Sequence, residues 1–352
     1  MNPSALMPNP DPIPVAWGWF EGLNLLTFGL HIIFVNVLLG AGILALFLGV
    51  RERGNPAAKS VSRKLPALFA LAVNLGVAPL LFLQVLYGHL FYTSTILSAV
   101  WWLAAIGLLV GGYYFLYWHQ PGGADAKPKN PLLLALGVLL VLMVSLVMTN
   151  VLATTEHPEL WREYFNNAQG TILNFFEPTT VPRYLHFLMA SLALGGLFLG
   201  LLAHYEKGLA QAAPKAGPLG MRVFTVATML QMAVGLWWFI ALDRAVMLQF
   251  LGGNKPATGL FLLALLLATP TLAYGFMGKA RPAAFWAFLT ILAMAGLRAM
   301  LRSFTLEPNF SPRDLAVTGE SSPLVLFLAT LVVGLAVVAY MLRLAFRPNK
   351  EA

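Results

Sequence analysis

Residues 23–49 read LNLLTFGLHIIFVNVLLGAGILALFLG and contain no Asp, Glu, Lys or Arg. A helix that crosses the hydrocarbon core of a bilayer needs about 20 consecutive, mostly apolar residues. This stretch is long and apolar enough to cross a bilayer once, with a single ionisable side chain, His31, inside the span. It therefore predicts a helical membrane protein.

Eight further stretches have the same character. The nine predicted spans lie near residues 23–49, 66–91, 96–118, 132–152, 182–202, 223–242, 258–277, 282–301 and 323–341. Hydrophobic residues make up 59% of the chain and charged residues 10%, whereas soluble domains carry about 25% charged residues. We expect an all-α integral membrane protein with about nine transmembrane helices, in which residues 1–352 form a single transmembrane domain.

The loops differ in basic charge. Most of the 22 Lys and Arg residues fall on one side of the predicted bundle, and the others are Arg162, Arg183, Arg244, Lys255, Arg298, Arg302 and Arg313. Because the side richer in Lys and Arg stays in the cytoplasm, the N-terminus is expected outside and the C-terminus in the cytoplasm, as in a multi-pass protein of the cell inner membrane. Residues 1–15 hold no Lys or Arg, so we expect the first helix to be retained rather than cleaved as a signal peptide.

The chain has no cysteine. Disulfides, iron–sulfur clusters and covalent haem attachment within this chain are therefore excluded, and any redox cofactor must be held by His, Met or a carboxylate. No basic run is interleaved with aromatic residues, which argues against nucleic acid as a partner.

Three of the six histidines fall in the outer halves of predicted spans: His31, His89 and His186. Ionisable side chains inside a membrane are costly and mark functional positions, and imidazole is an axial ligand of haem iron. The alternative is that each histidine bonds a carbonyl or hydroxyl of a neighbouring helix. His119 and His204 are interpreted as interfacial residues.

The loop at residues 153–181 is the longest on the outer side, and its apolar residues have helical spacing. We expect it to lie along the membrane surface, with His157 accessible to solvent. No Asp or Glu falls in the middle of a predicted span, which counts against a proton-coupled transporter. Arg298 and Arg302 are either interfacial or bind haem propionates or an anionic headgroup, since a guanidinium suits carboxylates.

The order of these features resembles subunit I of the cytochrome bd quinol oxidase family. LTFGLHIIFVNVLLGAGILALFL at 26–48 is similar to that family's first helix, NLGVAPLLFLQVLYG at 74–88 to its second, and FEPTTVPRYLHFLMASLALGGLFL at 176–199 to its fifth. Residues 302–334 are similar to the segment before its last helix and to that helix. The resemblance implies bd-like helix bundles, with haem b bound non-covalently by His31 and His186.

The sequence also departs from that family. The third predicted span lacks the family's glutamates, the haem glutamate falls near Ala299, and the quinol-binding loop shrinks to about residues 243–257. These departures favour electron transfer over oxygen reduction. His89 has no counterpart in the family and is a candidate third ligand, with Met300 and Met294 as further ones.

The resemblance therefore implies a membrane b-haem electron-transfer subunit of a quinol-linked respiratory oxidoreductase. It would link the quinol pool to an outer-face acceptor such as a c-type cytochrome, with other membrane subunits as partners and quinone as a further candidate cofactor. Arg183, Arg298 and Arg302 would hold haem propionates. Two alternatives stay open: a bd-type terminal quinol oxidase subunit, and a haem-free membrane scaffold or transporter.

Overall fold

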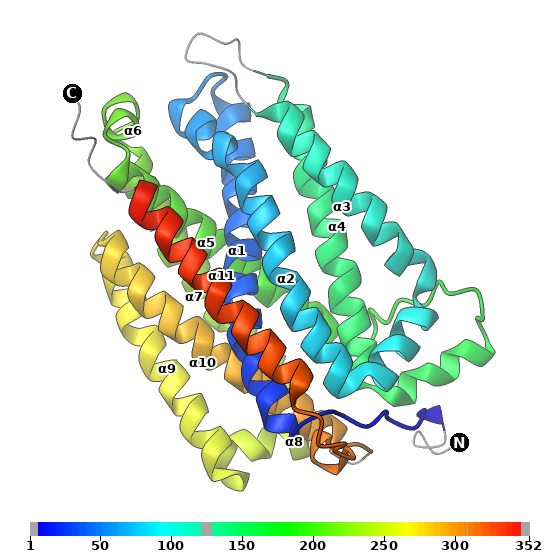
Figure 1. Ribbon diagram of the computed structural model, residues 1–352. Helices are drawn as coiled ribbons and strands as arrows, with labels where there is room; N and C mark the ends of the chain where they lie inside the picture. Colours follow the sequence, from blue (N-terminus) through cyan, green and yellow to red (C-terminus); the bar gives the residue numbers. More distant parts are fainter. Residues whose placement is uncertain (1–5, 121–128, 308, 346–352) are drawn as a thin grey trace.

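The computed structural model describes residues 6–120, 129–307 and 309–345, and within them the regular secondary structure is helical. The long helices are α1 Trp17–Arg51, α2 Pro56–Leu97, α3 Ala99–His119, α4 Pro131–Glu156, α5 Thr180–Tyr205, α7 Ala216–Ala241, α9 Lys255–Phe276, α10 Ala280–Leu306 and α11 Ser322–Ala345. The short segments are η2 Pro158–Phe165, α6 Lys207–Ala212, α8 Arg244–Leu248, η3 Gln249–Gly253 and η4 Pro312–Asp314. Figure 1 shows the long helices side by side in a bundle.

Eight of the described helices, α1 to α5, α7, α9 and α10, are long and apolar enough to cross a membrane. The prediction of an all-α, multi-pass membrane protein is confirmed at this level. The last predicted span, near 323–341, falls on α11, which has a shorter apolar stretch at Ser322–Gly334.

The helices extend beyond the predicted spans where their ends are polar. The second span was predicted from residue 66, but α2 begins at Pro56, because the side chain of Asn55 accepts hydrogen bonds from the amides of Ala57 and Ala58 at 3.0 and 3.1 Å. Asparagine is a favoured N-cap and proline suits the first helical turn. Asn130 and Asn254 begin α4 and α9 in the same way.

The helices form two groups of four, α1–α4 and α5, α7, α9 and α10 (Figure 1). In the first group α1 packs mainly on α2, and α3 on α4; in the second, α5 packs mainly on α7, and α9 on α10. α11 lies outside both groups and contacts α2, where the rings of Phe327 and Phe82 meet edge to face at 5.2 Å.

The two groups join where α1 crosses α5. A Cβ atom on Gly40 would lie 1.7 Å from the carbonyl oxygen of Ser191, and one on Gly195 would lie 2.2 Å from the carbonyl carbon of Gly40. Only glycine permits such a close approach of two backbones. Beside this contact the buried Ser191 hydroxyl donates a hydrogen bond to Oδ1 of Asn36 at 2.8 Å.

The crossing involves the same pattern on both helices. Residues 31–40 read HIIFVNVLLG and residues 186–195 read HFLMASLALG, so each has a histidine, then a small polar residue, then the crossing glycine at identical spacing. A helix rises about 1.5 Å per residue. His31 and His186 therefore lie at the same distance from the crossing, about 13 Å, toward the end of the bundle where α1 and α5 begin. We call this end the N-terminal face.

Candidate functional site

His31 is anchored to the neighbouring helix α2. Its Nδ1 lies 2.8 Å from the backbone carbonyl oxygen of Ala72. One turn further along α2, Gly76 faces the ring, and a Cβ atom there would approach the ring carbon Cε1 to 2.7 Å. The sequence thus provides both the acceptor and the space for the imidazole.

His186 is anchored to α7 by the same device. Its Nδ1 lies 3.1 Å from the carbonyl oxygen of Gln231. Gly235, one turn further along α7, faces the ring, and a Cβ atom there would lie 3.1 Å from the ring carbon Cε1. In addition, the side-chain amide of Gln231 lies 3.4 Å from Nε2 of His186.

These contacts assign the Nδ1 proton in both rings, because a carbonyl oxygen only accepts. The neutral Nδ1–H form leaves the lone pair on Nε2. Histidines that bind metals commonly donate the other ring N–H to a carbonyl, which fixes ring orientation. For His186, a ligand at Nε2 would require the Gln231 amide to turn away.

His89 lies elsewhere, near the C-terminal end of α2, which is at the N-terminal face of the bundle. Its ring meets Phe310 edge to face at 4.5 Å, and its Nε2 is buried with no hydrogen-bond partner among the described residues. Met300 and Met294 pack at the edge of the apolar cluster around Val246. In the part of the chain that the structure describes, no three His, Asp or Glu side chains are grouped as a metal site, so the metal prediction rests on single histidines.

The three predicted arginines do come together, around a carboxylate that sequence reasoning missed. Arg183 Nη2 donates to Glu156 Oε2 at 2.7 Å, Arg298 donates to Glu156 Oε1, and Nε of Arg302 is 3.9 Å from Oε1. The Glu156 side chain is 1% exposed. The fourth span was predicted to stop at residue 152, which left Glu156 outside the membrane helices; α4 in fact ends at Glu156.

Aromatic rings complete the arginine cluster. The guanidinium of Arg302 lies over the ring of Tyr87 at 5.0 Å and that of Arg183 over Trp238 at 5.4 Å. Tyr87 sits at the kink of α2, where its backbone is non-helical (φ −129°, ψ 21°). The carboxylate of Glu21 is near enough to interact electrostatically with Arg302.

The arginine cluster carries excess positive charge and unused donors. Three guanidinium groups face the carboxylates of Glu156 and Glu21. Within the described residues, the buried atoms Nε and Nη1 of Arg183, Nη1 of Arg298, and Nε and Nη1 of Arg302 have no hydrogen-bond partner. Buried donors without partners are costly, so the cluster is suited to an additional anion.

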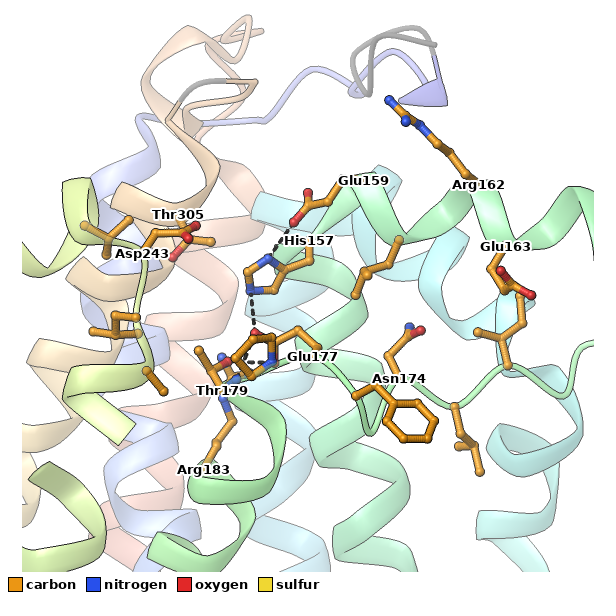
Figure 2. Close-up of a pocket in the computed structure, with 18 of the residues that line it drawn as sticks. His157, Glu159, Arg162, Glu163, Asn174, Glu177, Thr179, Arg183, Asp243 and Thr305 are labelled. Atoms are coloured by element: carbon orange, nitrogen blue, oxygen red, sulfur yellow. Dashed lines mark hydrogen bonds and ion pairs between the residues drawn. The ribbon is translucent and has the colours of Figure 1, made fainter. Parts of the chain in front are cut away.

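A pocket of about 810 Å³ opens at the N-terminal face beside this cluster. Arg183 lies at its inner end, and Glu159, Glu177 and Asp243 lie around it (Figure 2). Glu163 also lines it. At the exposed rim the carboxylates Glu159, Glu163 and Asp243 outnumber Arg162, and the inner end, at Arg183, is basic.

His157 bridges two of these acidic groups. Its Nδ1 lies 2.8 Å from Glu159 and its Nε2 3.6 Å from Glu177, as Figure 2 shows. The side chain is 13% exposed and lines the pocket, so His157 is more buried than the sequence predicted. Burial opposes its protonation, but the hydrogen bond to Glu159 and the charges of Glu177 and Glu159 outweigh burial and raise the pKa of His157.

The loop that forms the pocket is fastened to the helices. Glu177 caps α5 by accepting hydrogen bonds from the amide and hydroxyl of Thr179 and the hydroxyl of Thr180. The backbone N–H of Asn174 donates a hydrogen bond to the side-chain oxygen Oδ1 of Asn150 at 2.6 Å. Between the end of α4 and the start of α5, residues 158–165 form η2, and these contacts hold the rest of the loop in an irregular path.

Comparison of the sequence with models of known protein families and with curated proteins found no match. The functional conclusion therefore rests on the site itself.

Proposed function

We propose that this chain is a membrane b-haem electron-transfer subunit. The observation that carries the proposal is the paired arrangement of His31 and His186, each held through Nδ1 by a carbonyl of the adjacent helix and each facing a glycine. One such histidine is an ordinary helix–helix contact. Two such histidines at the same depth, each nine residues before the glycine where α1 and α5 cross, are more than helix packing requires.

The proposal includes the membrane topology. With α11 as a ninth span, the N-terminal face carries the fewer Lys and Arg residues and is the outer face. Glu156, the arginine cluster and the pocket then lie at the outer boundary of the inner membrane.

The residues present fit the polar groups of a haem. His31 and His186 would bind iron through Nε2. The partnerless N–H groups of Arg183, Arg298 and Arg302 would donate to propionates, because a guanidinium fork matches a carboxylate. The excess positive charge of the arginine cluster would offset the negative charge that propionates bring into a low-dielectric site.

Bound haem supplies reversible one-electron chemistry. The role of the protein is to fix the imidazole rings, to exclude water from them and to hold the arginine N–H donors in place. Asn36, Ser191, Gly40 and Gly195 keep α1 and α5 in register, so that both histidines stay at one depth.

The charge of the outer face indicates the kind of soluble partner. Glu159, Glu163 and Asp243 outnumber Arg162 at the exposed rim of the pocket, and this net negative charge would complement the basic surface of a soluble electron carrier such as a c-type cytochrome. Electrons would come from membrane quinol, and other membrane subunits would complete the oxidoreductase.

The test is the haem content of purified variants. His31→Ala and His186→Ala should each lower the extracted haem b per chain, because each removes an axial ligand. His119→Ala is the matched control, since His119 lies at the opposite face, where its Nδ1 is 3.3 Å from the carbonyl oxygen of Asn130. Size-exclusion elution in detergent checks that each variant is folded. Unchanged haem content in both folded variants would reject the proposal.

A further inference from the structure

A second large cavity lies at the face opposite the N-terminal face. It has a volume of about 900 Å³ and is bounded by the end of α5, the start of α7 and the turn between α9 and α10. Gly200 of α5 and Gly275 of α9 line it and let α7 pack closely on both helices, because a Cβ atom there would lie 2.9 Å from Met221 Sδ and 2.8 Å from Thr225 Oγ1.

The mouth of this cavity is basic. His204, Arg222, Lys279 and Arg281 line it, and among the described residues no carboxylate does. Arg281 donates a hydrogen bond to the hydroxyl of Tyr205 at 2.8 Å. Among the described residues, no ion pair involves Arg222, Lys279 or Arg281. The cavity therefore favours an anion.

The inner wall of the same cavity is apolar. Val226 and Met229 lie along α7, further from its start than Arg222, and the buried Met221 lies next to Arg222. Arg222 sits on the same helix at the boundary between the two zones and is exposed. The ligand must therefore carry a negative group at one end and an apolar body at the other.

We propose that this cavity binds an anionic phospholipid, with the phosphate of the headgroup among Arg222, Lys279 and Arg281 and an acyl chain along Val226 and Met229. Basic pockets between transmembrane helices bind anionic headgroups. A quinone has a neutral headgroup and would leave the cations without a partner. The site is independent of the proposed haem function.

The experiment measures retention of phosphatidylglycerol and phosphatidylcholine by the intact protein with native mass spectrometry. Each basic residue near a lipid surface contributes about 1 kcal/mol, so Arg222→Gln combined with Lys279→Gln should weaken phosphatidylglycerol binding about 30-fold. Phosphatidylcholine binding should not change. Arg222→Lys should retain most of the affinity, because it keeps the charge.

The control is Arg51→Gln combined with Arg53→Gln, which removes two positive charges from the same face but outside the cavity. Equal loss in the control, or no loss in the cavity variant, would overturn the proposal. If the double cavity variant does not fold, Met229→Trp tests the same site by filling its apolar wall, and unchanged lipid retention would overturn the proposal. Displacement of the lipid by excess inorganic phosphate would also overturn it, because the cavity would then recognise the anion alone.

Discussion

His31 on α1 and His186 on α5 have the same anchor but different surroundings. His186 also contacts Trp238, with ring centroids 5.8 Å apart, and Trp238 in turn lies beneath the guanidinium of Arg183. Among the described residues, no ring contact of this kind involves His31. The same contact, between Nδ1 and a carbonyl oxygen of the adjacent helix, thus occurs twice. Only the second one, at His186, lies next to the buried arginine cluster. If both histidines hold haem, the two haems should differ in reduction potential, because nearby positive charge favours the reduced form.

The largest effect should come from removing the carboxylate at the centre of the arginine cluster. Glu156→Gln leaves three buried arginines facing a neutral side chain, and breaking a buried pair costs about 3–5 kcal/mol. Thermal unfolding in detergent measures the loss.

Glu206→Gln is the matched control for this change. Glu206 pairs with Lys64 at 2.7 Å, but its side chain is 35% exposed, so the loss should stay within about 1 kcal/mol. Equal losses in the two variants would show that the arginine cluster is not held together by Glu156.

The two histidine anchors should differ in their tolerance of a methyl group. A Cβ on Gly76 would come to 2.7 Å from the His31 ring, and one on Gly235 to 3.1 Å from the His186 ring. Overpacking costs about 1–3 kcal/mol, so Gly76→Ala should lower the melting temperature more than Gly235→Ala. Both variants should shift the absorbance of bound haem. A larger destabilisation by Gly235→Ala would contradict the geometry.

The smallest effect concerns pH and comes from His157, in the loop between α4 and α5. The pKa of His157 is raised in the folded state. The stability that it contributes is therefore fully present below its unfolded pKa of about 6.5 and is lost as pH rises through the folded value. Between pH 6 and 8 we expect a loss of about 1 kcal/mol or less. His157→Gln should remove this slope from the unfolding midpoint, and a slope unchanged in the variant would assign the pH effect to another group.

The sequence was sufficient for the fold class and for the positions of most helices, because hydrophobic length alone selects membrane spans. It misplaced helix ends, where polar residues such as Asn55 and Glu156 extend a helix beyond its apolar part. The Asn–Pro steps before α2 and α4 were readable N-terminal signals.

The candidate site was only partly predictable. The three arginines could be identified from their positions at span ends, but nothing local indicates that they share Glu156, which is 27 residues from Arg183 and 142 from Arg298. The matching spacing of His31 to Gly40 and of His186 to Gly195 was readable in the sequence. Its meaning depends on the crossing of α1 and α5, which only the packed structure gives.

The central claim is that these two histidines hold haem b. The most direct test is a reduced-minus-oxidised spectrum of the purified wild-type protein, combined with extraction and quantification of haem. The account predicts bands of low-spin b-type haem with no chlorin band. A well-folded preparation without haem would contradict it, and His31 and His186 would then be helix–helix contacts alone.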